Sequence, residues 1–389
     1  MSFEPERPTS AYPRPLPRWL LPLAAVALLS GVAGFLFGPG HPREPWIALL
    51  VNFLFWTTLA QGAVVWAAVL RLAGTRWGAP LIRVGEGAVA FLPLSLLLLL
   101  ALYPGRALLL PWLGQDLGDR AAWLNLPAVS ARLLGGLALM TALSLVYVRL
   151  HLLPAAGPRP RFALSVALPV AYAVVYSLVA FDLVMSLRPF WVSSLLGPYF
   201  FTGGMYAAMA AMIVLTAHTP RRLGRQRWLD TGNLLLAFGM LTTYMLFTQL
   251  LVIWYENLPA ETIFLLPRYS LPPWHALSWV MLGVGLLGPF LALLIKGVKT
   301  RPHLLRIVAA AALLGMGLER YLLVAPSLTP QNPVVGAPTV LITLGCGGLC
   351  LLSWLAFLYR YPPTSPVDDA RAAAPPASAH RPSVPREVW

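Results

Sequence analysis

The stretch FDLVMSLRPFWVSSLLGPYFFTGGMYAAMAAMIVLTA, residues 181–217, places an acid, a base and a proline between two apolar runs. One run begins near Phe162 and ends at this stretch, and the other extends from Gly197 to Ala217. Each is close to the roughly 20 residues that a helix needs to cross about 30 Å of hydrocarbon. Asp182 and Arg188 are therefore predicted to lie at a membrane boundary.

The composition is typical of a membrane protein that crosses the bilayer many times. The 389 residues are 58% hydrophobic and 11% charged, with a mean hydropathy of +0.71. This leaves too little polar surface to cover a soluble core of that size. The net charge of +14 could indicate a nucleic-acid partner, but the cations lie in short loops between apolar runs. That placement is a topology signal, so no nucleic acid is expected.

Ten apolar runs predict an all-α protein with about ten transmembrane helices. They cover 19–38, 46–72, 86–104, 131–152, 162–182, 195–217, 230–256, 273–296, 303–325 and 336–360. The transmembrane domain is thus expected over 19–360, with disordered, proline-rich ends at 1–18 and 361–389. Ten spans put both ends on one side, which carries 21 of the 28 Lys and Arg residues. The positive-inside rule makes that side cytoplasmic.

A weak internal repeat predicts two four-helix bundles, formed by helices two to five and six to nine, with flanking helices. The third helix begins with Arg83 and Glu86, and the seventh begins with Arg227 and Asp230, in the same Arg-x-x-acid pattern. Parallel repeats of this kind occur in membrane proteins. The alternative is that each acid only caps a helix start, where a negative charge is favourable.

The seventh predicted helix is the most polar one. Thr242, Gln249 and Glu256 recur every seven residues on one face, and Tyr255 lies on an adjacent face. Because polar groups in lipid must face protein or water, one interpretation is a proton route or the wall of a quinone-adjacent cavity. The other is ordinary hydrogen bonding between helices.

The remaining charged residues predict ion pairs or further members of a proton route rather than a catalytic centre. The candidates for that route are Asp182, Glu86 and Asp230. Asp182 could pair with Arg188, while solvated pairs at helix ends are expected for Glu86 with Arg83, Asp230 with Arg227, and Glu319 with Arg320. Cys346 and Cys350 alone cannot complete a zinc or iron–sulfur site, which needs about four ligands. The chain is therefore expected to bind no metal or haem itself, and autonomous catalysis is not expected.

Three motifs resemble the ActF-like membrane subunit of alternative complex III, a quinol:cytochrome c oxidoreductase whose membrane subunits are related to the polysulfide-reductase (NrfD-like) proteins. The first is the run from Phe181 to Trp191, continued from Ser193 to Gly204. The others are the segments 230–238 and 249–262, and the resemblance covers about 46–325.

The resemblance implies a subunit that supports assembly, the environment of the quinol site and proton movement. The implied partners are a homologous NrfD-like membrane subunit, an iron–sulfur/molybdopterin-like subunit and c-type cytochrome subunits, which would carry the clusters and haem c. A quinone is the only cofactor that this chain itself could contact, and no residue can be assigned to it. The alternative function is a ten-helix secondary transporter, which the repeat and the buried polar groups also favour.

The chain departs from the family pattern Ser-Leu-Asp-Pro-His-Trp, because Arg188 and Phe190 replace its acid and histidine. Neither replacement exchanges a proton near neutral pH. If the family uses those side chains as an outer proton exit, this chain either uses Glu256, Glu261 and His275 instead or lacks the exit.

Overall fold

The computed structural model describes residues 15–36, 42–75, 78–152, 157–216, 224–331, 333 and 335–362. These residues form helices and connecting loops, without a strand. Nine of the helical spans are long and apolar enough to cross a membrane, and the shorter apolar helix Leu20–Leu36 accompanies them. The predicted all-α polytopic fold is therefore confirmed. Most of the two ends predicted to be disordered, 1–18 and 361–389, lies outside these ranges.

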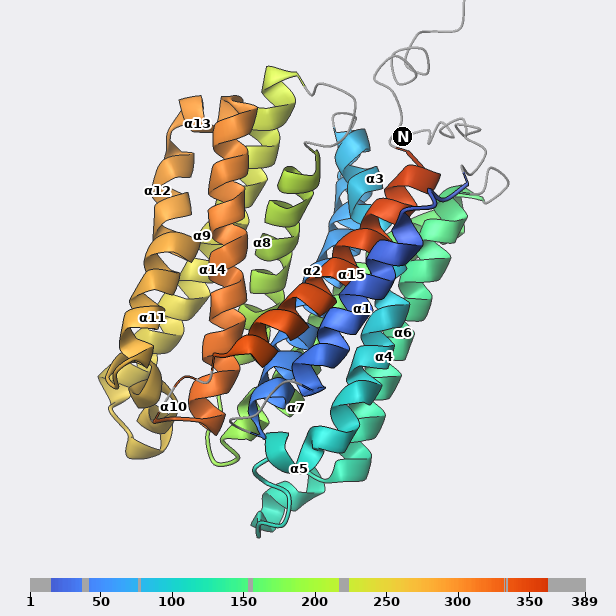
Figure 1. Cartoon of the computed structure of the whole chain (residues 1–389). Helices are drawn as coiled ribbons and strands as arrows, with labels where there is room; N and C mark the ends of the chain where they lie inside the picture. Colours follow the sequence, from blue (N-terminus) through green and yellow to red (C-terminus); the bar gives the residue numbers. More distant parts are fainter. Residues whose placement is uncertain are drawn as a thin grey trace, which may run out of the picture.

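Two four-helix bundles make up most of the molecule (Figure 1). The first contains α2 (Glu44–Leu72), a span formed by α3 (Ala79–Gly87), η2 (Ala88–Phe91) and α4 (Leu92–Leu102), then α6 (Leu126–Leu152) and α7 (Pro158–Leu183). The second contains α8 (Leu196–Leu215), α9 (Arg225–Glu256), a span formed by α11 (Trp274–Val280), η7 (Met281–Leu287) and α12 (Gly288–Leu294), then α14 (Pro302–Leu328). The expected pairing of helices two to five and six to nine is thus present.

The remaining elements flank the bundles or close their ends. α1 (Leu20–Leu36) packs mainly against α15 (Ala337–Arg360), which itself packs against α2. η3 (Tyr103–Gly105), α5 (Arg106–Leu109), η4 (Gly118–Ala122), η5 (Met185–Leu187) and α10 (Pro259–Tyr269) lie in the connections at one end, and α13 (Lys296–Thr300) lies at the other. α1 starts and α15 ends at the upper end in Figure 1, opposite α5 and α10. We call the α1-start end the inner end and the other the outer end.

The two bundles meet where α2 packs against α8. Both helices are buried along most of their length, whereas α9 is largely exposed to the surroundings. Small residues on α8 permit this contact: a Cβ added to Gly204 would lie 2.1 Å from the Thr58 Cγ2 atom of α2. A Cβ on neighbouring Gly203 would instead face the second bundle, 2.9 Å from the end of the Met316 side chain. The Gly203-Gly204 pair therefore lets α8 serve as a wall of both bundles.

The span α11–η7–α12 contains a π-helical stretch that has a packing explanation. Gly285 lies so close to Gly315 of α14 that a Cβ on Gly315 would be 2.0 Å from the Gly285 Cα. The widened turn leaves the Gly285 carbonyl accessible to the Tyr206 hydroxyl, which donates to it at 3.1 Å. A neighbouring helix thus supplies a hydrogen bond to the irregular backbone, as backbone polar groups within the membrane require.

Glu44 connects the first bundle to the flanking helix α15. Its Oε1 atom accepts hydrogen bonds from the Gly336 amide at 2.6 Å and the Thr339 hydroxyl at 2.9 Å. These groups lie at the start of α15, where the first amides have no partner within the helix. A carboxylate there also interacts favourably with the helix dipole.

Candidate functional site

At the outer end of the first bundle, Asp182 forms an ion pair with Arg132. Asp182 is fully buried, and Arg132 of α6 donates from Nη2 to Oδ1 at 2.8 Å and from Nε to Oδ2 at 3.0 Å. The Arg132 guanidinium also lies 4.0 Å from the centre of the Trp123 ring. Two parallel hydrogen bonds of this kind fix geometry as well as charge.

The predicted pair of Asp182 with Arg188 is wrong. α7 ends at Leu183, and the Asp182 carboxylate pairs with Arg132 of α6 instead, with no ion pair to Arg188 among the described residues. The Arg188 Nε atom is buried without a hydrogen-bond partner, and burial lowers the pKa of this guanidinium. Arg188 is close enough to Arg268 of α10 to interact with it electrostatically.

At the inner end of the first bundle, Glu86 is fully buried and paired twice. It accepts from Arg71 Nη2 at 2.6 Å and from Arg83 Nη1 at 2.9 Å. The expected contact of Glu86 with Arg83 is present. The pair was expected to be solvated, which is wrong, because α2 and α15 pack against α3 and the Glu86 side chain is fully buried.

Hydrogen-bonded polar groups occupy the interior between these two ion pairs. Gln61 donates to the Ser144 hydroxyl at 2.8 Å, and the hydroxyls of Tyr172 and Tyr176 donate to backbone carbonyls at 3.1 and 3.3 Å. Gln61 is separated from Arg71 by about 15 Å along α2, at about 1.5 Å per residue. That gap is too long for direct proton transfer, so these bonds mainly join helices of the first bundle.

In the second bundle, Glu319 and Arg320 form a buried ion pair inside α14. Glu319 Oε2 accepts from Arg320 Nη1 at 2.8 Å, and the two side chains are each 2% exposed. Arg320 Nη2 donates to the Phe200 carbonyl of α8 at 2.8 Å, and its guanidinium lies 4.0 Å from the Phe200 ring centre. The predicted solvated pair at a helix end is wrong, because α14 continues to Leu328 and α8 covers the pair.

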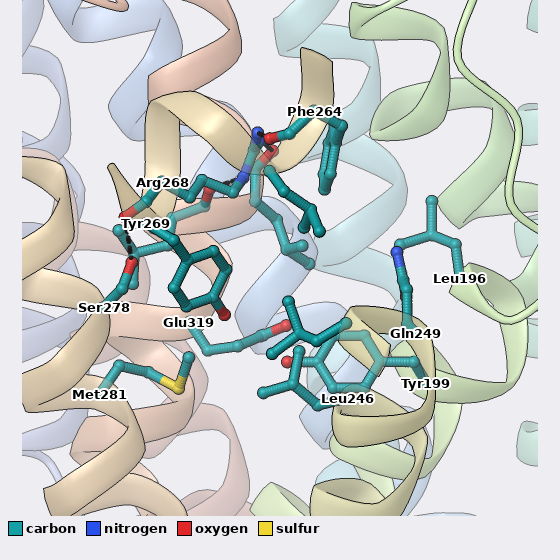
Figure 2. Close-up of a pocket in the computed structure, with 14 residues that line it drawn as sticks. Leu196, Tyr199, Leu246, Gln249, Phe264, Arg268, Tyr269, Ser278, Met281 and Glu319 are labelled. Atoms are coloured by element: carbon teal, nitrogen blue, oxygen red, sulfur yellow. Dashed lines mark hydrogen bonds between the residues drawn. The ribbon is translucent and has the colours of Figure 1, made fainter. Parts of the chain in front are cut away.

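The second carboxylate oxygen of Glu319 faces a small cavity. Glu319 Oε1 is buried without a hydrogen-bond partner. The cavity has a volume of about 30 Å³, and its polar lining comes from Tyr199, Gln249, Arg268, Tyr269, Ser278 and Glu319. In Figure 2 the hydroxyl ends of Tyr199 and Tyr269 point towards the Glu319 carboxylate. Since one water needs roughly 10–15 Å³ of such space, a water fits beside the unpartnered oxygen.

Arg268 holds the outer wall of this cavity in place. It is buried and donates to the carbonyls of Leu322 at 2.8 Å and Leu323 at 2.7 Å, near the end of α14. The Leu322 carbonyl needs such a donor, because the residue four positions later is Pro326, which has no amide hydrogen. Burial lowers the pKa of the Arg268 guanidinium.

Tyr269 adds a hydroxyl that stays protonated. Burial raises its pKa to about 12, and the nearby Arg268 guanidinium opposes part of that rise. Near neutral pH this phenol therefore keeps its proton and is able to donate a hydrogen bond. It can orient a carboxylate or a water in the cavity.

One aromatic stack separates this cavity from a second one. The Trp191 and Phe264 rings lie 3.8 Å apart at an interplanar angle of 6°. Phe264 lines the Glu319 cavity, whereas Trp191 lines a cavity of about 160 Å³ at the outer end of the first bundle. Arg120, Trp123 and residues of the 181–192 segment form the rest of that second wall.

The polar face predicted on the seventh helix, now α9, divides into buried and exposed parts. Gln249 is buried and lines the Glu319 cavity, and Thr242 is buried and donates to the Phe238 carbonyl at 2.8 Å. Glu256 and Tyr255 lie at the exposed end of α9, where Tyr255 is 83% exposed.

The other predicted acids and His275 do not join the cavity. Glu261 is half-buried in the first turn of α10, and His275 is exposed on α11. Asp230 accepts a hydrogen bond from Gln226 at 3.0 Å, and in the described part of the chain no ion pair joins it to Arg227, contrary to the prediction. The two Arg-x-x-acid segments therefore differ, since only the one containing Glu86 forms a buried ion pair.

The central residues of the cavity could have been found from one signal in the sequence. Glu319 and Arg320 lie inside the predicted apolar run 303–325, and charged residues within a span are rare and tend to face the protein interior. Arg71, Arg132 and Arg268 gave no comparable signal, because their partners come from other helices.

Across the described ranges, no three His, Cys, Asp or Glu side chains are grouped so that they could hold a metal ion. Cys346 and Cys350 are buried, unlinked residues of α15. No protein-family model matches the chain, and no curated protein matches it. The resemblance to alternative complex III therefore depends on the sequence motifs alone.

Proposed function

We propose that the chain is an integral subunit of a quinol:electron-acceptor oxidoreductase of the alternative complex III type, in a bacterial inner membrane with both termini cytoplasmic. Its part is to support assembly and the environment of the quinol site, and to hold a proton at Glu319. The proposed partners are an NrfD-like membrane subunit, an iron–sulfur subunit and c-type cytochromes, which carry the haem and clusters.

The observation that carries the proton-holding part is the unpartnered Oε1 atom of Glu319 beside a water-sized cavity. A buried carboxylate oxygen without a partner is costly, and either a proton or a water removes that cost. The Tyr199 and Tyr269 hydroxyls and the Gln249 amide surround the same space. The 21 cations on one side support the orientation.

Purification from native membranes tests the assembly. The expected result is co-purification with haem c and iron–sulfur subunits and quinol-dependent reduction of an acceptor. Isolation of a spectrally silent protein that acts alone would contradict the proposal. Substrate uptake by proteoliposomes containing only this chain would instead support a secondary transporter.

Variants of the purified complex test the role of Glu319. Glu319→Gln and Tyr269→Phe are expected to lower the turnover of quinol oxidation, because general acid–base catalysis typically accelerates a reaction by about 100-fold or more. Glu256→Gln is the matched control, since this acid is exposed at the same end. If Glu319→Gln and Tyr269→Phe oxidised quinol as fast as the control Glu256→Gln, proton handling at Glu319 would be contradicted. The assembly proposal would still be decided by the purification experiment.

A further inference from the structure

The connection between the two bundles at the outer end carries an arginine that no acid neutralises within the described ranges. Arg188 lies between the spans Pro158–Leu187 and Leu196–Leu215. Its Nε atom is buried without a hydrogen-bond partner, and no ion pair joins it to an acid of those ranges. Asp182, the acid nearest to it in the sequence, is already held by Arg132. The five N–H donors of the Arg188 guanidinium therefore remain free to bind an anion.

A second arginine without an acidic partner adjoins this connection. Arg120 of η4 donates to the Pro189 carbonyl, and its guanidinium lies 5.3 Å from the centre of the Phe190 ring. Asp119 precedes Arg120 in the chain, but in the part of the chain that the structure describes no ion pair joins the two. Arg120 and Arg188 thus meet at Pro189, and their combined charge favours an anionic partner.

Large apolar side chains surround the two arginines. Phe190 and Val192 are 60% and 61% exposed, and Trp123 is 44% exposed. All three lie in connections outside the membrane-spanning helices, where lipid chains do not cover them. Exposed apolar patches with a polar rim mark sites where another protein binds. We call Arg120, Trp123, Arg188, Phe190 and Val192 the outer docking surface.

The cavity of about 160 Å³ borders this surface, because Arg120, Trp123 and Val192 all line it. Another of its walls is Trp191, which is 1% exposed and whose Nε1 atom has no hydrogen-bond partner. An apolar cavity of roughly 150 Å³ holds a benzene ring. The space therefore suits an aromatic side chain, and an oxygen atom beside that ring would give the Trp191 donor an acceptor.

We propose that the outer docking surface binds a peripheral protein through a segment in which an aromatic side chain neighbours an aspartate or glutamate. The ring enters the cavity, and the carboxylate pairs with the guanidinium groups that meet at Pro189. Aromatic and arginine side chains carry much of the binding energy of protein interfaces. The inference rests on the proposed function, which supplies such a protein as a c-type cytochrome or iron–sulfur subunit at the outer face.

Release of the peripheral subunits from the immobilised complex tests this surface. The measured quantity is the rate at which haem c and iron–sulfur absorbance leaves the complex at one fixed salt concentration. Arg188→Glu is expected to raise this rate about tenfold or more, because losing one partner of an interfacial charge pair acts mainly on dissociation. Val192→Asp, at an exposed position, is expected to have a similar effect. Added salt is expected to accelerate release from wild type more than from Arg188→Glu, since it screens the attraction.

The matched control is Arg106→Glu, because Arg106 lies at the same end and contacts Tyr103 of its own turn. It is expected to release the subunits as wild type does. Wild-type release rates in both Arg188→Glu and Val192→Asp, or equal acceleration in Arg106→Glu, would overturn the docking surface alone. A wild-type chain that purifies without any peripheral redox subunit would overturn the proposed function together with this inference.

Discussion

Replacing Glu319 by leucine removes the carboxylate and leaves Arg320 charged inside the second bundle. Of its contacts with described residues, Arg320 then keeps its hydrogen bond to the Phe200 carbonyl and its cation–π contact with the Phe200 ring. Removing one partner of a buried ion pair costs about 3–5 kcal/mol, which raises the unfolding equilibrium constant by roughly 150- to 5,000-fold. We therefore expect Glu319→Leu to destabilise the protein by about that amount.

The double variant Glu319→Leu/Arg320→Met separates this cost from a loss of packing. It removes both charges at similar side-chain volume, and such replacements are neutral or stabilising by about 1–4 kcal/mol. Unfolding in mixed micelles titrated with sodium dodecyl sulfate, followed by tryptophan fluorescence, measures both variants. Glu256→Leu, at an exposed position, is expected to change stability by less than about 0.5 kcal/mol. A single variant as stable as wild type, or a double variant as unstable as the single, would refute the buried pair.

Three further predictions concern packing, helix capping and pH. Gly204→Ala is expected to cost about 1–3 kcal/mol in the same assay, because its Cβ would lie 2.1 Å from Thr58 Cγ2. Gly203→Ala is expected to be nearly neutral, and equal effects of the two variants would contradict the assigned contacts. Glu44→Ala leaves the first amides of α15 unpaired, so hydrogen exchange there is expected to accelerate; unchanged exchange would count against the cap. Burial raises the pKa of Tyr269 to about 12, so its stabilising contribution is complete below about pH 10, its unfolded pKa, and is lost as pH rises through 12. Tyr269→Phe is expected to reduce that alkaline loss, and an identical pH profile would argue against a buried phenol.

The fold followed from hydropathy because the length of each apolar run is a local property. The third and eighth spans were predicted as simple helices, and hydropathy does not report their 3₁₀ and π stretches. The π stretch depends on Gly315 and Tyr206, which come from other helices. Backbone irregularity of this kind is set by tertiary packing rather than by local sequence.

The candidate site was harder to predict, because ion pairs join residues that are distant in sequence. Asp182 could be recognised as important from its position, but its partner Arg132 is 50 residues away. The nearer Arg188 was the natural candidate until the end of α7 was known. On α9, the heptad spacing grouped Thr242 and Gln249, which are both buried, with Glu256, but it could not show that the helix end carrying Glu256 is exposed.

The stack of Trp191 on Phe264 stands between the cavity beside Glu319 and the larger cavity at the outer end of the first bundle. Because each ring lines one of the two cavities, water that passed directly between them would have to displace an aromatic side chain. Shortening Phe264 to alanine would therefore be expected to connect the two cavities.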